Sequence, residues 1–236
     1  MKYFLYVITC FFLACDTNNK RGTQIVATPP FWNDIQNFKK QDSIHFPPKN
    51  AILFLGSSSF TKWTDVQLYF PGYTIINRGF GGSTLLDQIR YANDIIFPYE
   101  PKQIVIYCGE NDLASSDTIT AAIVVDRFKQ LYKMIREKTE APIAYISMKP
   151  SPSRRHLFLK MRGANLMIML FMAEQDPKAM LRSSFYSGPA KFIDIQNKML
   201  NEKGEPIPEI FLEDSLHMNE KGYAIWKKEI EPYLIK

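Results

Sequence analysis

Short apolar runs alternate with longer amphipathic segments along most of the chain. Five runs have the composition of strands that are buried on both faces of a sheet. They are AILFL (51–55), YTII (73–76), QIVIY (103–107), PIAYIS (142–147) and KFIDI (191–195). Because strands that alternate with helices form a parallel sheet covered by helices on both faces, the pattern predicts an α/β/α sandwich around a five-stranded, mainly parallel sheet.

Apolar residues at helical spacing lie between and after these runs. Four helices are predicted from this spacing: one marked by Leu85, Ile89, Ala92 and Ile96, one by Val124, Phe128, Leu131 and Ile135, one by Leu166, Met169, Leu170 and Ala173, and one by Tyr223, Trp226, Ile230 and Tyr233. A shorter helix is predicted within residues 29–40, with Trp32, Ile35 and Phe38 on one side. No repeat and no further boundary is visible, so residues 31–236 are expected to form one domain.

The N-terminal stretch MKYFLYVITCFFLAC has a different pattern. Its apolar run from Tyr3 to Ala14 is too short to span a membrane and suits the hydrophobic region of a secretory signal. The run ends in FLAC, which resembles a bacterial lipobox, where the signal is cut before a cysteine that is then lipidated; Phe12 departs from that motif. We therefore predict a signal peptide over residues 1–14 and a lipidated Cys15 that begins a flexible tether over residues 15–30. A plain signal peptide cut at another small residue is the alternative.

These predictions place the protein outside the cytoplasm, anchored to a membrane only through its N-terminal lipid, in the periplasm or on the cell surface. Removal of the signal peptide would also remove Cys10, and acylation of Cys15 would leave Cys108 as the one thiol. An intrachain disulfide framework is then not expected. The pattern indicates neither the membrane face nor the oligomeric state.

The composition narrows the classes of function. The 236 residues carry a formal net charge of +5, and no dense Lys/Arg tract is present, so a nucleic-acid partner is not expected. The chain also lacks the G-x-S-x-G, H-E-x-x-H, Walker and C-x-x-C motifs. We therefore expect neither a metal nor an organic cofactor.

Polar residues that can bind a ligand or take part in a reaction follow several of the predicted strands. FLGSSSF (54–60) contains the end of the first strand, NRGFGGS (77–83) follows the second, GEND (109–112) follows the third, and DSLHMN (214–219) precedes the last helix. Each segment alone has an ordinary explanation as a turn or a helix cap. In a parallel sheet, however, the carboxyl ends of the strands form the ligand crevice, so together these segments indicate one site.

In chain order the four segments resemble the blocks of the SGNH/GDSL hydrolase family. The blocks stand here as Gly56-Ser57-Ser58, Gly82, Gly109-Glu110-Asn111-Asp112 and Asp214-Ser215-Leu216-His217, and the resemblance covers about residues 50–236. Ser57 stands where the family usually has Asp, and Ser59 where it usually has Leu or Ile. This serine-rich first block leaves Ser57 and Ser59 as alternatives to Ser58 for the nucleophile.

The resemblance implies a flavodoxin-like SGNH hydrolase fold and a role for each matching residue. Ser58 is implied as the nucleophile, and the backbone N–H groups of Ser58 and Gly82 with the side-chain amide of Asn111 are implied as the oxyanion hole. A serine hydroxyl needs a base that removes its proton, and His217 is the candidate, with Asp214 three residues earlier to orient its ring.

Two other histidines compete with His217. His45 belongs to DSIH, which has the same Asp-Ser-x-His pattern, but it precedes the first strand whereas Ser58 follows it. A strand of five residues spans about 17 Å, so His45 is expected at the opposite edge of the sheet, in a surface or linker role. His156 follows the fourth strand at the correct edge, but it has no acidic residue three positions earlier; an exposed polar loop is the simpler interpretation, and substrate contact the other.

The sequence thus predicts a serine esterase or acylhydrolase that cleaves carboxylic esters. O-acetyl or other short-acyl esters of carbohydrates or small molecules are favoured because no long apolar lid is visible. A lipase, lysophospholipase or thioesterase acting on longer chains is the alternative, and a non-catalytic binding lipoprotein with the same fold is an alternative from another class. Methionines within one predicted helix either fill the core or form an apolar wall for an acyl chain; they are Met161, Met167, Met169 and Met172.

Overall fold

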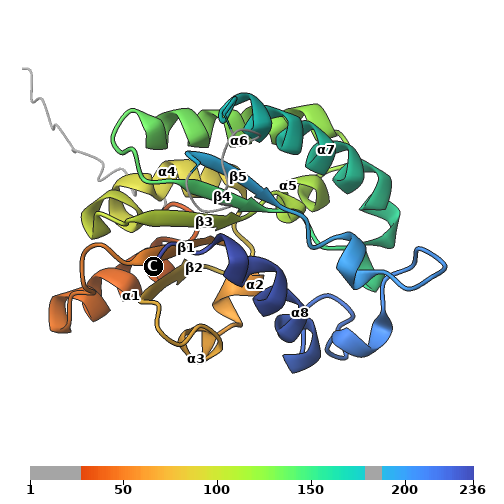
Figure 1. The fold of residues 1–236 in the computed structure, drawn as a ribbon, viewed down its shortest axis with the longest axis horizontal. Helices are drawn as coiled ribbons and strands as arrows, with labels where there is room; N and C mark the ends of the chain where they lie inside the picture. The colour runs from red at the N-terminus through yellow and green to blue at the C-terminus, as the bar shows by residue number, and fades with distance from the viewer. Residues whose placement is uncertain (1–27, 179–187) are drawn as a thin grey trace, which may run out of the picture.

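A parallel β-sheet forms the centre of the molecule (Figure 1). The structure is a computed structural model that describes residues 28–178 and 188–236. The five strands pair in the order β2-β1-β3-β4-β5, and every pair is parallel. Their bounds are β1 Ile52–Gly56, β2 Ile75–Gly79, β3 Gln103–Tyr107, β4 Ile143–Ile146 and β5 Ala190–Ile193. The predicted five-stranded parallel α/β fold is confirmed.

Helices cover both faces of this sheet, and Figure 1 shows α6 and α7 above it and α2 and α8 below it. The α-helices are α1 Trp32–Ile44, α2 Ser58–Thr61, α3 Val66–Tyr69, α4 Leu85–Ile95, α5 Glu110–Ser115, α6 Ala121–Arg136, α7 Phe158–Glu174 and α8 Glu220–Ile230. Short 3-10 helices join them: η1 Phe97–Tyr99, η2 Pro152–Leu157, η4 Asn197–Met199, η5 Pro208–Ile210 and η6 Glu231–Tyr233.

Two hydrophobic cores result from the alternation of side chains along the strands. Leu53 and Leu55 of β1 point into one core, which they share with α1, α4, α6 and α7. Ile52 and Phe54 of the same strand point into the other core, which contains Trp63 and the apolar face of α8. Both faces of β1 are therefore buried. Packing on both sides fixes the position of the carboxyl end of the strand between the helical layers.

The edge strand β2 extends further than its apolar residues suggested. The prediction covered residues 73–76, whereas the strand runs over Ile75–Gly79 and includes Asn77 and Arg78. Each polar side chain has a specific partner: the Asn77 amide donates to the carbonyl oxygen of Phe60 at 2.7 Å, and Arg78 forms an ion pair with Asp42 of α1. These tertiary contacts allow polar residues to continue a strand that apolar patterning alone would end.

The inward face of α7 differs from the prediction. Leu166 and Leu170 were expected to mark the buried side, but they are 53% and 54% exposed. The buried face is formed instead by Met161, Ala164, Asn165, Ile168 and Met172. The prediction of the face was wrong because α7 carries apolar residues around nearly its whole circumference, so the spacing does not show which side is covered. Met161 and Met172 fill the core, whereas Met167 and Met169 are exposed.

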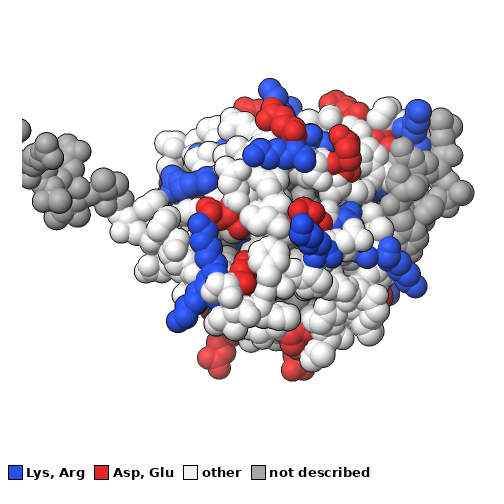
Figure 2. Space-filling view, turned by 90° about the vertical axis from the view of Figure 1, so that its left-hand side faces the viewer, with Lys and Arg blue, Asp and Glu red and all other residues white. Residues whose placement is uncertain are grey.

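Several predictions fall on residues that the structure does not describe. The signal peptide over residues 1–14, the lipidated Cys15 and most of the tether lie there. Within the described ranges, no helix has the length and apolar character needed to cross a bilayer. Figure 2 shows the face at the left of Figure 1, where basic and acidic side chains are interspersed. This face therefore presents no continuous field of one sign.

Candidate active site

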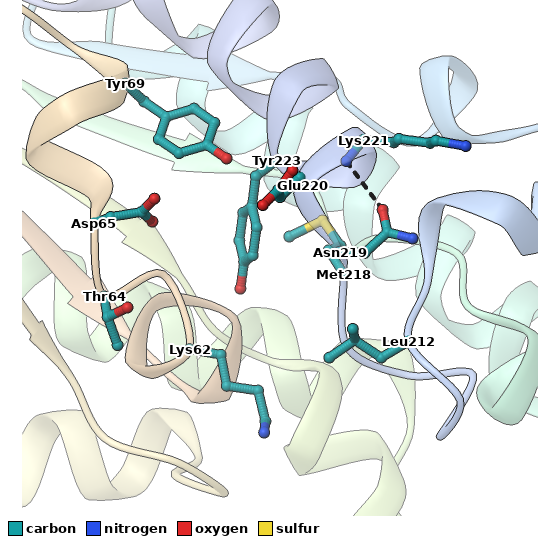
Figure 3. A pocket seen from close by; sticks show the side chains of 10 residues that line it. All are labelled: Lys62, Thr64, Asp65, Tyr69, Leu212, Met218, Asn219, Glu220, Lys221 and Tyr223. Carbon is teal, nitrogen blue, oxygen red and sulfur yellow. Dashed lines mark hydrogen bonds between the residues drawn. The ribbon is translucent and has the colours of Figure 1, made fainter.

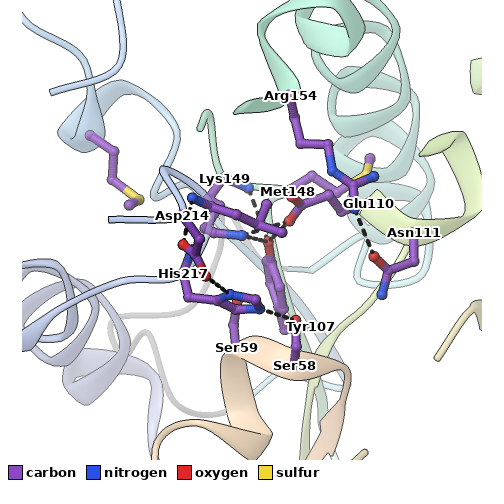
Figure 4. Close-up of polar contacts among 12 residues, drawn as sticks. Ser58, Ser59, Tyr107, Glu110, Asn111, Met148, Lys149, Arg154, Asp214 and His217 are labelled. Atoms are coloured by element: carbon purple, nitrogen blue, oxygen red, sulfur yellow. Dashed lines mark hydrogen bonds and ion pairs between the residues drawn. The ribbon is translucent and has the colours of Figure 1, made fainter. Parts of the chain in front are cut away.

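The candidate residues meet at the carboxyl ends of β1 and β3. The sheet order reverses between these two strands, and such a switch point is the usual ligand crevice of an open α/β sheet. Helix α2 begins directly after β1, helix α5 directly after β3, and the 214–217 loop precedes α8. Segments that are far apart in the sequence thus form one cluster, shown in Figure 4.

The turn after β1 depends on Gly56. A Cβ atom at this position would lie 2.0 Å from the carbonyl oxygen of Tyr107 in the neighbouring strand, so no larger residue fits without moving β3. Ser57 is extended and caps α2: its carbonyl oxygen accepts the N–H groups of Phe60 at 3.0 Å and Thr61 at 3.1 Å. The chain therefore changes from strand to helix within one residue, and Ser58 becomes the first residue of the helix.

Only one of the three consecutive serines contacts a histidine within the described part of the chain. Oγ of Ser58 lies 2.9 Å from Nε2 of His217. The side chains of Ser57 and Ser59 are buried instead, and Oγ of Ser59 has no hydrogen-bond partner among the described residues. The structure therefore brings Ser58 to His217 and directs its two neighbours elsewhere.

Asp214 holds the other side of the His217 ring. Its Oδ2 lies 2.6 Å from Nδ1 of His217, while its Oδ1 accepts the backbone N–H groups of Leu216 at 3.0 Å and His217 at 2.9 Å. Partial burial acts to raise the pKa of Asp214, but the hydrogen bonds from the His217 ring and the two N–H groups outweigh it and hold the pKa well below its usual range. The carboxylate thus fixes the ring and keeps a negative charge beside it.

Hydrogen bonds from outside the 214–217 loop maintain its shape. Ser215 has a positive φ of 55°, which is uncommon for a residue with a side chain. Its carbonyl oxygen accepts the N–H of Ser153 in η2 at 3.1 Å, and its own N–H donates to the carbonyl oxygen of Leu212 at 2.9 Å. The carbonyl oxygen of His217 accepts the N–H of Leu212 at 2.8 Å. The position of the imidazole therefore depends on two neighbouring segments as well as on Asp214.

Gly82 lies in a tight turn that packs beside Ser58. The N–H of Ser83 donates to the carbonyl oxygen of Phe80 at 3.3 Å, and Gly82 occupies the turn position with a φ of +84°. A Cβ atom on the adjacent Gly81 would lie 3.8 Å from Cβ of Ser58. The backbone N–H groups of Ser58 and Gly82 have no hydrogen-bond partner within the described ranges, so both remain available to a ligand.

Asn111 is tied to the same turn. Its Nδ2 donates to the carbonyl oxygen of Ser83 at 3.1 Å, which uses one of its two N–H bonds. The next residue, Asp112, is completely buried; its Oδ2 accepts the N–H of Leu85 at 2.9 Å, and its Oδ1 pairs with Arg127 at 2.8 Å. Burial raises the pKa of Asp112, against the lowering effect of Arg127 and the Leu85 N–H. Asp112 therefore joins three helices rather than facing the serine.

A buried charged cluster beside the site was not found from the sequence. Nζ of Lys149 lies 2.7 Å from Oε2 of Glu110, and the hydroxyl of Tyr107 donates to the same oxygen at 2.6 Å. Burial, together with the charge of Glu110, raises the pKa of Tyr107 well above its usual value, so the phenol keeps its proton. Because Glu110 directly precedes Asn111, the cluster anchors the start of α5. The signal available was a pair of opposite charges placed after two neighbouring predicted strands.

The two competing histidines lie elsewhere. His45 is exposed at the end of α1, and Asp42 of the same motif is engaged with Arg78 and Tyr99. His156 is exposed in η2. Neither forms a hydrogen bond with Ser58 in the described structure. Of the three histidines, the structure brings His217 alone to the serine.

A cavity of about 630 Å³ is lined by residues that follow Ser58 and His217 in the sequence, although neither of these two residues lines it (Figure 3). Lys62, which lines it, donates its backbone N–H to the carbonyl oxygen of Ser58 at 2.9 Å, and Met218, also in its wall, follows His217. The remaining wall combines two tyrosine rings and one leucine with charged and polar side chains: Thr64, Asp65, Tyr69, Leu212, Asn219, Glu220, Lys221 and Tyr223. Across residues 28–178 and 188–236, no group of three or more His, Cys, Asp or Glu side chains is arranged to hold a metal ion.

Known proteins resemble this chain in structure but not in sequence. No family model matches the chain, and no curated protein matches it. A GDSL-like lipase from Bacteroides thetaiotaomicron is 17% identical, with a TM-score of 0.67, and the match covers 84% of this chain and 95% of that one.

Two further solved structures are similar. A lipase/acylhydrolase from Enterococcus faecalis is 20% identical, with a TM-score of 0.52 over 77% of this chain and 95% of that one. A catalytic mutant of an acetylxylan esterase from Geobacillus stearothermophilus is 13% identical, with a TM-score of 0.59 over 80% of this chain and 99% of that one. The chain therefore has the α/β fold of the GDSL-like hydrolases.

Proposed function

We propose that the protein is a serine esterase that hydrolyses carboxylic esters through Ser58, His217 and Asp214. The observation that carries the proposal is the continuous hydrogen-bonded chain from Asp214 Oδ2 to His217 Nδ1 at 2.6 Å and from His217 Nε2 to Ser58 Oγ at 2.9 Å. A neutral imidazole with its proton on Nδ1 donates to Asp214 and presents an unprotonated Nε2 to the serine. This is the arrangement that activates a serine hydroxyl.

The reaction has two steps. Nε2 of His217 takes the hydroxyl proton as Oγ of Ser58 bonds to the ester carbonyl carbon, and the carbonyl electron pair moves onto oxygen. The tetrahedral oxyanion then collapses, the bond to the alcohol oxygen breaks, and the alcohol leaves with the proton from Nε2. Water repeats the sequence on the acyl-enzyme, which releases the carboxylic acid and restores Ser58.

The oxyanion requires preorganised donors. The N–H groups of Ser58 and Gly82 and the second N–H of Asn111 are the proposed set, because none of the three has a protein partner in the described structure. Fixed neutral donors stabilise charge that develops in the transition state, and the loss of one such donor typically costs about 10² to 10³ in rate.

We infer that the substrate is an O-acetyl or other short-acyl ester of a carbohydrate or small polar molecule. Support comes from the lining of the cavity that Lys62 and Met218 share, where the Tyr69 ring is accompanied by charged side chains such as Lys62, Asp65 and Glu220. Such walls offer both a stacking surface and donors and acceptors for hydroxyl groups. The similar acetylxylan esterase acts on an acetylated polysaccharide, as its name states, which agrees with this proposal.

The protein is further proposed to work outside the cytoplasm, attached to a membrane through lipidated Cys15. The sequence FLAC at the end of a short apolar segment supports this. Mass spectrometry of protein extracted from membranes should show a mature N-terminus at Cys15 with an added acyl mass. A soluble product with an unmodified N-terminus elsewhere would indicate an ordinary secreted enzyme.

Hydrolysis of p-nitrophenyl esters tests the proposed activity. Wild-type protein should release p-nitrophenol fastest from the acetate and progressively more slowly from longer acyl chains, and Ser58→Ala should reduce the rate to background. A maximum at long chains would instead favour a lipase or thioesterase. Equal, background rates for wild type and Ser58→Ala at every length would favour a binding protein without catalysis.

A further inference from the structure

Arg154 lies beside Asn111 and has an unusual environment for an arginine. It belongs to η2, at a position where its φ of −107° interrupts the helical backbone. Nη2 lies 3.4 Å from Oδ1 of Asn111, as Figure 4 shows, and Nη1 is buried with no partner among the described residues. No ion pair joins Arg154 to any acidic residue of the described ranges, whereas the adjacent Arg155 pairs with Glu205 at 2.7 Å.

The two polar neighbours of Asn111 determine which way its amide points. A guanidinium group can only donate hydrogen bonds, and a backbone carbonyl can only accept them. Arg154 at one end therefore requires Oδ1, and the Ser83 carbonyl at the other end requires Nδ2. A rotation of the amide by 180° would oppose donor to donor and acceptor to acceptor. The pair thus keeps the N–H bonds on the side of the glycine turn.

The charge of Arg154 adds to this geometric effect. A cation at the carbonyl end of an amide polarises it and strengthens its N–H groups as donors, and the effect is larger where water is partly excluded. Because Nη1 is buried and Arg154 has no carboxylate partner in the described structure, its charge is not locally neutralised. The field of this cation therefore favours negative charge near Asn111.

The backbone beside Arg154 supports the other half of the site. Ser153 donates its N–H to the carbonyl oxygen of Ser215 in the loop that carries His217. One short segment therefore contacts both the base loop, through its main chain, and the oxyanion amide, through its side chain. This double attachment fixes the distance between the two parts of the site.

We propose that Arg154 is a positioning residue that orients and polarises the oxyanion-binding amide of Asn111. The inference rests on the esterase function proposed above. Since Arg154 acts through Asn111 in the developing transition state, it affects kcat more than KM. Direct binding of a negatively charged part of the substrate is the competing role, and it would act mainly on KM and only for anionic substrates.

The test compares Arg154→Met, Arg154→Lys and the control Arg155→Met in the full chain. The substrates are p-nitrophenyl acetate and a p-nitrophenyl ester whose acyl chain ends in a carboxylate. Arg154→Met should lower kcat on the order of tenfold to hundredfold on both esters with KM changed by less than about twofold. Arg154→Lys should retain part of the rate because it keeps the charge, and Arg155→Met should match wild type.

A double-mutant cycle isolates the route of the effect. In an Asn111→Ala background, Arg154→Met should lower kcat by less than about twofold, because the amide on which Arg154 acts is gone. An undiminished loss in that background, or a loss confined to the KM of the anionic ester, would overturn the proposal in favour of direct substrate binding.

Full activity of Arg154→Met would also overturn the proposal while leaving the esterase function intact. If Arg154→Met has lost its thermal unfolding transition, Arg154→Lys decides, and a wild-type kcat for that variant overturns the proposal that the guanidinium group orients the Asn111 amide. Absence of hydrolysis in the wild type would instead overturn the proposed function and this inference with it.

Discussion

Arg127 of α6 donates from Nη1 to Oδ1 of Asp112 at 2.8 Å, and the Asp112 side chain is completely buried. The second carboxylate oxygen accepts the N–H of Leu85 at the start of α4. A single carboxylate, on the residue that follows Asn111, therefore joins α4, α5 and α6. The GEND segment is thus held in place by Asp112, although Asp112 does not face the serine.

Replacement of Asp112 by Asn should destabilise the fold. The variant leaves the guanidinium of Arg127 without its counter-ion in a largely buried position, and breaking such a pair costs about 3 kcal/mol. Urea unfolding should show this decrease in the free energy of unfolding. The control is Asp126→Asn, an exposed residue next to Arg127, which should stay within about 0.5 kcal/mol of wild type. Equal stability of the two variants would contradict the structural role of the buried pair.

Those parts of the candidate site that depend on residues close together in the sequence could be predicted from the sequence. The spacing of Asp214 and His217 is short, and the Asp214 carboxylate accepts hydrogen bonds from the backbone and the ring of His217 within the same segment. The position of Ser58 follows from the end of β1, and the apolar run 103–107 coincides with β3 because that strand is buried on both faces. Local patterns and strand ends therefore indicate the strands, apart from the polar end of β2, and select the residues of the proposed triad.

Features that depend on distant contacts could not be predicted in this way. Lys149 and Glu110 are 39 positions apart, and their placement after two predicted strands indicates the pair only once the order of the strands in the sheet is known. Arg154 and Asn111 are separated by 43 positions. The inward face of α7 was also missed because its apolar residues surround the helix. In each case the tertiary arrangement, rather than the local pattern, decides which side chains are buried.

His217→Ala should lower kcat by about 10³-fold or more, because no other base reaches Ser58 in the described structure. His45→Ala should leave kcat unchanged, since that residue is exposed at the end of α1. The measurement is the initial rate on p-nitrophenyl acetate, with circular dichroism as the control for folding. A large loss in His45→Ala with little loss in His217→Ala would reverse the assignment.

Asp214 should stay ionised over the neutral and mildly acidic pH range. The pKa of Asp214 is held well below its usual range, so its carboxylate remains ionised throughout neutral and mildly acidic pH. A depressed pKa of this kind contributes stability above the unfolded-state value near 4 and loses it only as pH falls through the lowered folded-state value. Down to about pH 5, ionisation of Asp214 should therefore make no contribution to the pH dependence of log(kcat/KM) or of the free energy of unfolding. A loss of stability between pH 7 and pH 5 that is absent from Asp214→Asn would contradict the lowered pKa.

Asn111→Ala distinguishes a catalytic amide from an ordinary turn residue. If its second N–H serves the oxyanion, the hydrogen bond strengthens only as negative charge develops, so the substitution should lower kcat by about 10² with little change in KM. If Asn111 only supports the turn through Ser83, the loss should appear as reduced stability of about 1 kcal/mol, with kcat nearly intact.

Asn111→Asp sharpens this comparison because it keeps the size of the side chain. An ionised carboxylate at this position has no N–H to offer and would repel the oxyanion, so its kcat should be at least as low as that of Asn111→Ala. Its negative charge would also pair with Arg154, which should limit any loss of thermal stability. A stable but inactive Asn111→Asp protein is therefore expected. An active variant of normal stability would remove Asn111 from the oxyanion hole and leave the backbone N–H groups of Ser58 and Gly82 as its donors.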